Sequence, residues 1–129
     1  MKKIFLLLAL MLSPVMALAA GGGACGSLAK CEHAPVDLHN KESLQNGAKI
    51  FISYCLGCHS AKYLRYERMA QDLEIDPKLV EEYMMFTTDK IGEGMDPKTN
   101  KKDQAKWFGN APPDLSLETR LQSPDWVYT

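Results

Sequence analysis

The densest group of reactive side chains in this sequence is the pentapeptide Cys55-Leu56-Gly57-Cys58-His59, which has the spacing C-x-x-C-H. Two cysteines three positions apart lie on one turn of the chain, where each thiol can add to one vinyl group of a haem. The histidine that follows is then placed to offer an imidazole nitrogen to the iron. This spacing is typical of covalent haem attachment. We therefore expect Cys55 and Cys58 to hold one haem c covalently and His59 to be the proximal ligand of the iron.

Two other chemistries use cysteines in this number. Cys25, Cys31, Cys55 and Cys58 are four thiols, which is the ligand count of a structural zinc site. The first pair, however, has an unusually wide spacing and lies in a glycine-rich stretch. A redox C-x-x-C of the thioredoxin kind requires a strand before the motif and a βαβ context. The helical periodicity before Cys55 argues against this second alternative.

The N-terminal residues predict export. Met1-Lys2-Lys3, the apolar run 4–12 and the small residues Ala17-Leu18-Ala19 have the order of a secretory signal, so residues 1–19 are predicted to be a cleaved signal peptide. Residues 20–41 begin with three glycines within their first four positions and predict an extended leader. An exported chain meets an oxidising compartment, which favours a disulfide between Cys25 and Cys31 over two unpaired thiols.

Residues 42–129 predict one helical domain. Leu44, Ala48 and Phe51 recur with helical spacing, and Gly47, Phe51 and Cys55 lie on successive turns of one face, as in the first helix of a c-type cytochrome. Further helices are predicted over 63–73, from Pro77 to about residue 85 and over 115–121, with a surface loop over 87–102. No segment alternates long enough to predict a sheet. The predicted fold class is therefore all-α, a c-type cytochrome fold around one covalent haem.

Composition excludes several other classes. A chain of 129 residues has room for one domain after its signal, and 15 basic against 16 acidic side chains give a formal net charge of −1. This balance gives no electrostatic case for nucleic-acid binding. Beyond the first twenty residues the chain has no apolar run of 18, so it is not expected to carry a membrane span of its own.

Several stretches resemble bacterial cytochrome c1, the haem subunit of the quinol–cytochrome c reductase (bc1) complex. They are residues 58–66 (CHSAKYLRY), 106–116 (KWFGNAPPDLS) and 123–129 (SPDWVYT). The resemblance implies an electron-carrying subunit, not an enzyme by itself, that passes electrons from the Rieske iron–sulfur protein to a soluble or membrane-bound cytochrome c. It also implies cytochrome b as a partner and a location on the periplasmic face of the inner membrane.

The same resemblance suggests further haem contacts. It implies that Asn110, Ala111, Pro112 and Pro113 line the haem and that Arg120 and Trp126 lie near its propionates. The family usually has Arg-x-Arg after the proline turn, whereas this sequence reads Arg120-Leu121-Gln122. A neutral glutamine supplies neither the charge nor the two-pronged donor geometry of arginine.

The sixth ligand of the iron stays open. In the family, the methionine ligand and a C-terminal transmembrane helix come later than Thr129, and the helix start Ser123-Pro124-Asp125 is followed by only four residues. We therefore expect the N-terminal part of a cytochrome c1, truncated before the C-terminal elements. The alternative is a free-standing small periplasmic cytochrome c with Met95 as sixth ligand. If Met95 is no ligand, it is expected to be a surface residue of a polar loop.

Overall fold

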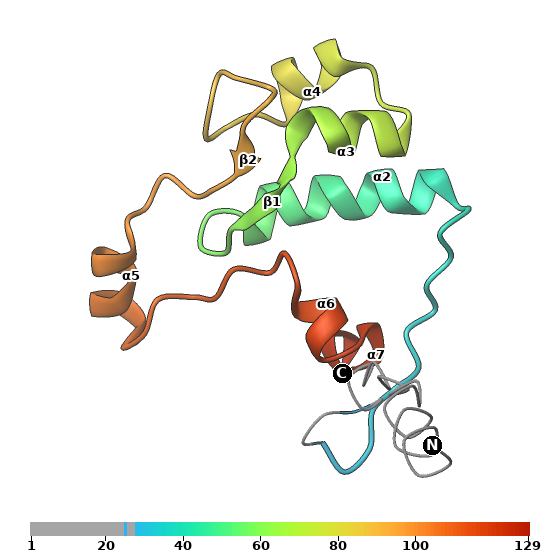
Figure 1. Ribbon diagram of the computed structural model, residues 1–129, viewed down its shortest axis with the longest axis vertical. Helices are drawn as coiled ribbons and strands as arrows, with labels where there is room; N and C mark the ends of the chain where they lie inside the picture. Colours follow the sequence, from blue (N-terminus) through green and yellow to red (C-terminus); the bar gives the residue numbers. More distant parts are fainter. Residues whose placement is uncertain (1–24, 26–27) are drawn as a thin grey trace, which may run out of the picture.

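A computed structural model describes residue 25 and residues 28–129. The predicted signal peptide, residues 1–19, lies outside the described residues. Figure 1 shows the elements in chain order. They are α2 (Lys41–Ile50), the π-helical turn η1 (Phe51–Cys55), β1 (Ala61–Arg65), α3 (Tyr66–Leu73), α4 (Pro77–Tyr83), β2 (Gly94–Met95), α5 (Lys101–Phe108), α6 (Glu118–Leu121) and α7 (Pro124–Tyr128).

The helix that leads into the C-x-x-C-H motif is present as predicted. The Asn40 side chain accepts a hydrogen bond from the Ser43 backbone N–H at 3.0 Å and so caps the start of α2. The helix continues without a break into η1, which ends at Cys55. Leu44 and Ala48 are half-buried, whereas Ile52 of η1 is fully buried. This packing fixes the direction in which the chain enters the motif.

The prediction of an all-α fold is wrong in one region. Residues 63–65, predicted as the start of a helix, belong to β1 instead, and β1 pairs antiparallel with β2, with Ala61 opposite Met95. The reason is tertiary: the pairing partner of β1 lies about thirty residues further along the chain, and two residues are too few to show alternation. Gly94 makes the pairing possible, because a Cβ at this position would lie 2.3 Å from the Lys62 carbonyl oxygen. The fold is thus mostly helical with a two-stranded sheet.

The core lies where η1, the sheet, α3 and α4 meet (Figure 1). Its largest fully buried side chains are Tyr66, Leu56, Met95 and Val80. The expectation that Met95 is a surface residue of a polar loop is therefore wrong, because strand pairing turns its side chain inward. Helix α4 begins as predicted, with Asp76 as N-cap and Pro77 in the first turn.

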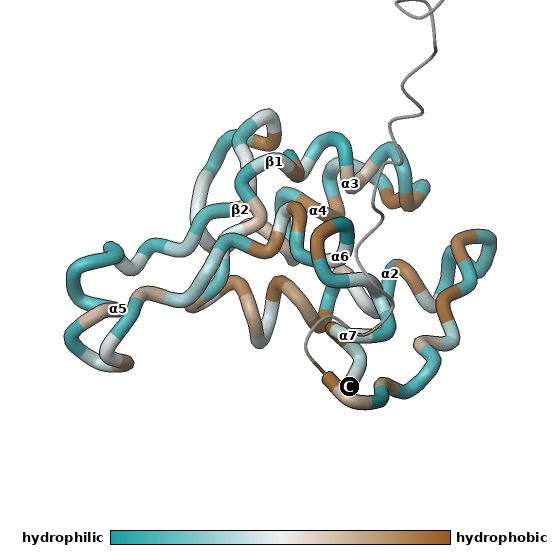
Figure 2. The backbone as a smooth tube through the Cα atoms, turned by 60° about the horizontal axis from the view of Figure 1, so that its bottom comes forward, coloured by the Kyte–Doolittle hydropathy of each residue, from teal (hydrophilic) through white to brown (hydrophobic). Residues whose placement is uncertain are grey.

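The second half of the chain is more open than the first. Helix α5, which falls partly in the predicted loop, stands apart from the other helices in two views (Figures 1 and 2). Helices α6 and α7 pack against each other beside the leader. Helix α6 is shorter than the predicted 115–121 and begins at Glu118. Among the described residues, no helix has both the length and the apolar character needed to cross a membrane.

Candidate haem site

The C-x-x-C-H motif folds into a single tight turn at the end of η1. The backbone N–H groups of Cys58 and His59 both donate to the Cys55 carbonyl, at 3.0 and 2.8 Å. The thiols of Cys55 and Cys58 are free and half-buried. One compact turn therefore carries both free thiols and the imidazole, as the chemistry predicted from the spacing requires.

The ring of His59 is held by a backbone carbonyl. Its Nδ1 lies 2.9 Å from the Pro113 carbonyl oxygen. A carbonyl only accepts hydrogen bonds, so Nδ1 carries the proton and the other ring nitrogen, Nε2, keeps a free lone pair in the neutral ring. A second partner that fixes the tautomer is typical of histidines that bind metals. The contact thus prepares His59 to ligate an iron through Nε2.

Asp114 fastens the segment that supplies this carbonyl. Its carboxylate accepts hydrogen bonds from the backbone N–H groups of Lys62 at 3.0 Å and Ser116 at 2.9 Å, and the Leu115 N–H donates to the Ser60 carbonyl at 2.7 Å. Burial works to raise the pKa of the Asp114 carboxyl, but the hydrogen bonds from Ser116, Ser60 and Lys62 outweigh it and hold that pKa well below its usual range. These hydrogen bonds therefore hold segment 111–116 beside the C-x-x-C-H motif.

A second polar contact reaches the motif from α5. Gln104 is only 2% exposed, and its amide N–H₂ donates to the Cys58 carbonyl at 3.0 Å and to Thr99 Oγ1 at 2.8 Å. The Thr99 hydroxyl in turn donates to the Gly57 carbonyl at 3.1 Å. Sequence reasoning missed both residues, because a glutamine on a polar helix gives no signal of burial. Together they attach the start of α5 to the C-x-x-C-H turn.

An apolar cavity of about 480 Å³ lies next to the motif. This volume is within the range of cofactor pockets, roughly 300–1,000 Å³. Its apolar lining consists of Phe51, Ala61, Leu64, Pro113, Leu115, Trp126 and Val127. The lining joins the start of η1, the strand after His59, segment 113–116 and helix α7. The cavity is linked to the motif through Pro113, which lines it and whose carbonyl contacts His59.

The indole of Trp126 indicates which kind of ligand fits the apolar cavity. Its Nε1–H is buried and has no hydrogen-bond partner among the described residues. A buried donor without an acceptor costs about 1–3 kcal/mol, so the indole N–H is suited to an acceptor that the described residues do not provide. A haem propionate is an anionic acceptor of this kind. The donor set of the motif and the unmatched indole both fit a haem.

The structure brings together only some of the residues suggested by the resemblance. Pro113 and Trp126 line the apolar cavity, whereas Pro112 lines a separate cavity together with Cys58. Ala111 is half-buried, and Asn110 and Arg120 are exposed. The lining of the apolar cavity includes none of these last three residues.

The alternatives weighed from the sequence fare differently. Cys25 and Cys31 form a disulfide, as favoured, with an S–S distance of 1.96 Å. A zinc site would need both as thiolates, so that alternative is wrong. No group of three or more metal-binding side chains occurs in the described part of the chain. Met95 lies in the core and is absent from the cavity lining, which counts against its role as sixth ligand.

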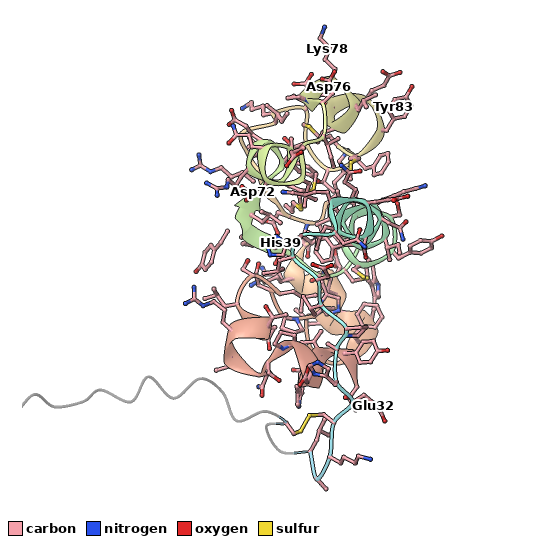
Figure 3. The ribbon with its side chains drawn as sticks, turned by 90° about the vertical axis from the view of Figure 1, so that its right-hand side faces the viewer. Glu32, His39, Asp72, Asp76, Lys78 and Tyr83 are labelled. Atoms are coloured by element: carbon pink, nitrogen blue, oxygen red, sulfur yellow. A yellow bond between two sulfur atoms is a disulfide. The ribbon has the colours of Figure 1, made fainter. Side chains whose placement is uncertain are left out.

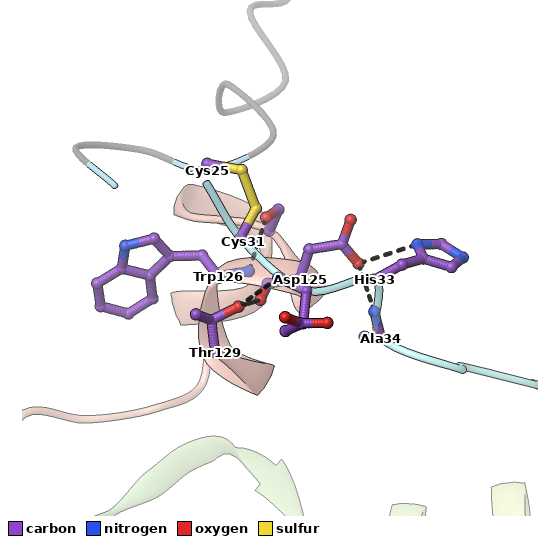
Figure 4. Close-up of a disulfide and its surroundings, with 9 residues drawn as sticks. Cys25, Cys31, His33, Ala34, Asp125, Trp126 and Thr129 are labelled. Carbon is purple, nitrogen blue, oxygen red and sulfur yellow. Dashed lines mark hydrogen bonds and ion pairs between the residues drawn. A yellow bond between two sulfur atoms is a disulfide. The ribbon is translucent and has the colours of Figure 1, made fainter. Parts of the chain in front are cut away.

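The leader reaches the site through α7 (Figure 4). The Ala34 N–H donates to Asp125 Oδ1 at 2.9 Å, and the Glu32 N–H donates to Thr129 Oγ1 at 2.8 Å. Together with a contact of 3.4 Å between His33 Nδ1 and the same Asp125 oxygen, these bonds hold both ends of the helix that carries Trp126. We call this set of contacts the leader clasp.

Residues 32–129 match the model of the Cytochrome C1 family. The chain belongs to the cytochrome c1 family. It is 46% identical to the cytochrome c1 of Allochromatium vinosum over all 129 of its residues, which cover 51% of that relative. It is also 40% identical to the ammonia monooxygenase gamma subunit of Nitrosomonas europaea over 125 residues, or 97% of this chain and 51% of that relative. The chain thus spans about half the length of the curated relatives that it matches.

Proposed function

We propose that this cytochrome c1 family chain carries one covalent haem c and transfers electrons in the quinol–cytochrome c reductase (bc1) complex. The observation that supports this most directly is the contact between His59 Nδ1 and the Pro113 carbonyl. It leaves Nε2 free as an iron ligand, on the same turn as two free thiols with the C-x-x-C spacing. The family match agrees with this reading.

Each residue has a defined part in the proposal. The Cys55 and Cys58 thiols add across the two vinyl groups, so that each forms a thioether, and His59 is the proximal ligand. Pro113 orients His59, and the Trp126 indole N–H donates to a propionate. Asn110, Ala111, Pro112 and Arg120 complete the surroundings of the haem, as the resemblance implies. When bound, the haem supplies a one-electron iron couple.

The proposed partners follow from the family. Electrons arrive from the Rieske iron–sulfur protein and leave to a soluble or membrane-bound cytochrome c, with cytochrome b as the membrane partner. Export through residues 1–19 would place the domain on the periplasmic face of the inner membrane, where covalent haem attachment takes place.

Expression in a host with periplasmic haem-ligation machinery tests the proposal. The mature chain should gain the mass of one haem, and the variant Cys55→Ser/Cys58→Ser should gain none. Cys25→Ser/Cys31→Ser is the matched control, because it also removes two sulfurs but should still load haem. An unloaded wild-type chain beside a loaded control cytochrome would contradict haem binding.

The role in the complex needs a separate measurement. A tagged chain, expressed in its source organism, should copurify with cytochrome b and the Rieske protein from solubilised membranes. A haem-loaded chain recovered without either of them would leave the haem site intact and refute the bc1 role.

A further inference from the structure

Charge is distributed unevenly on either side of the C-x-x-C-H turn. Residues 66–93, which include α3 and α4, contain eight acidic and three basic side chains. Residues 94–106, which include most of α5, contain four lysines and two aspartates. Two of the acids of the first segment, Asp72 and Asp76, lie near the end of the molecule that is far from Glu32 (Figure 3). Residues 94–106 therefore carry a net charge of +2, beside a segment, 66–93, whose net charge is −5.

Three lysines of segment 94–106 have no charged partner among the described residues. Lys62 pairs with Asp96 at 3.1 Å and Lys106 with Asp103 at 3.1 Å. Lys98, Lys101 and Lys102 are exposed and form no ion pair within the described part of the chain. Their positive potential is thus not cancelled locally, and it extends over about 8–10 Å at physiological ionic strength.

Two exposed aromatic rings lie at the other end of α5. Trp107 and Phe108 are 61% and 59% exposed, and their rings pack edge to face with centroids 6.3 Å apart. Figure 2 shows that the helix stands at the edge of the molecule, away from the other helices. Aromatic and cationic side chains on one protruding element are the composition of an interface, because aromatic residues supply contact area and charges direct the encounter.

The same helix is tied to the proposed haem-attachment turn. Gln104 is the one buried residue of α5 and donates directly to the Cys58 carbonyl. Lys98 and Lys101 line a cavity of about 350 Å³ together with Cys58. A partner seated on these side chains would therefore rest beside a cysteine that we propose to carry the haem, which is the short separation that electron transfer requires.

We propose that the α5 face, defined as Lys98, Lys101, Lys102, Trp107 and Phe108, is a docking surface for an acidic one-electron metalloprotein. The proposal rests on the proposed function and specifies one of its partners. In the docked pair one electron moves and no proton does: the haem is oxidised from ferrous to ferric, and the partner's metal ion is reduced by one unit. The charge complementarity selects a partner whose surface is acidic.

Binding to an acidic blue-copper protein is the direct test. With the haem-loaded chain labelled in its two tryptophans, NMR should show the indole N–H signal of Trp107 shifting on titration at low ionic strength, while that of Trp126 stays in place. Lys101→Glu/Lys102→Glu should weaken association about tenfold or more, and the difference should vanish at high salt. Lys78→Glu, on the acidic end of the molecule (Figure 3), should change the affinity less than about twofold, because its charge lies farther from the docked partner than the screening length.

Three results would overturn the proposal. One is a Trp107 signal that does not move with the acidic protein. Another is a basic cytochrome c that binds as tightly and moves Trp107 as far. The third is binding of vesicles rich in anionic lipid to the lysines without binding of the acidic protein. Association is measured by the NMR signal of Trp107, and haem loading is measured by mass. The experiment therefore distinguishes an α5 face that does not bind from a chain that does not carry haem.

Discussion

Two of the segments that contribute to the lining of the apolar cavity, 111–116 (through Pro113, Leu115 and Ser116) and α7, are held in different ways. Segment 111–116 is tied to residues 58–63, its immediate neighbours in the site, through Asp114, the Ser60 carbonyl and His59. Helix α7 is held at its two ends by the leader, more than ninety residues away in sequence. The position of Pro113 is therefore determined within the site, whereas that of Trp126 depends on a distant part of the chain.

Local features of α7 explain why it needs outside support. It has five residues, and an isolated helix of this length is unstable in water. The Ser123 side chain caps it by accepting a hydrogen bond from the Trp126 N–H at 3.2 Å, but Ser123 has a φ of 104°, a value that residues other than glycine rarely adopt. The leader clasp thus offsets both a short helix and a strained start.

Among the variants considered, removal of the Asp114 carboxylate is expected to lower the free energy of unfolding the most. Asp114→Ala deletes the acceptor of two backbone N–H groups and should lower the free energy of unfolding by about 3 kcal/mol, because hydrogen bonds to charged groups are worth about 1.5–3 kcal/mol each. Urea titration of the haem-loaded chain measures it. Asp89→Ala, at an exposed position, is the matched control and should leave the midpoint unchanged. Equal midpoints for both variants would show that segment 111–116 is held by something else.

A methyl group on Gly94 should disturb the pairing of β2 with β1, the strand whose Lys62 also donates a hydrogen bond to Asp114. Gly94→Ala places a Cβ against the Lys62 carbonyl, so β1 and β2 must separate, at a cost of about 1–3 kcal/mol for an overpacked site. Gly92→Ala is the control, since a Cβ there has no atom within 4 Å. Thermal unfolding of the two variants compares them. A Gly94→Ala chain as stable as Gly92→Ala would contradict the close approach of the strands.

The features that could be predicted from the sequence are those determined by nearby residues, and the features that could not are those determined by distant ones. The C-x-x-C-H turn, the helix that carries Leu44 and Ala48 and the Asp76-Pro77 helix start are encoded within a few residues, and the structure has all three. The pairing of β1 with β2, the burial of Met95 and the bond from Gln104 to Cys58 depend on residues 29 to 46 positions apart. Periodicity contains no information about such pairs, so these features were missed.

Acid should weaken the Asp114 side of the site in a defined range of pH. The pKa of this carboxyl is lowered in the folded chain, so its contribution to stability is fully present above the unfolded pKa of about 3.9 and is lost as pH falls from there toward the folded value. The difference in unfolding free energy between wild type and Asp114→Ala should be constant above about pH 5 and should shrink below pH 4. Urea titrations at several pH values measure it. A difference that persists unchanged at the lowest pH would contradict the lowered pKa.

The smallest effect on stability is expected at the leader clasp, with a local effect at Trp126. Asp125→Ala removes the acceptor of the Ala34 N–H, a single partly buried hydrogen bond worth about 1 kcal/mol. It also removes the contact with His33, whose side chain is exposed, and such surface contacts add little to global stability. The unfolding midpoint should therefore stay close to that of the wild type. Helix α7 should nevertheless open more often, because a five-residue helix has few other restraints, and the buried Trp126 indole N–H should then exchange with deuterium severalfold faster. Asp37→Ala is the control, because its carboxylate accepts a hydrogen bond from the His39 N–H, also in the leader, at 2.8 Å and forms no hydrogen bond or ion pair with α7 among the described residues. If indole exchange in Asp125→Ala matches that of Asp37→Ala, the leader does not position Trp126, and the contrast between the two borders of the cavity fails.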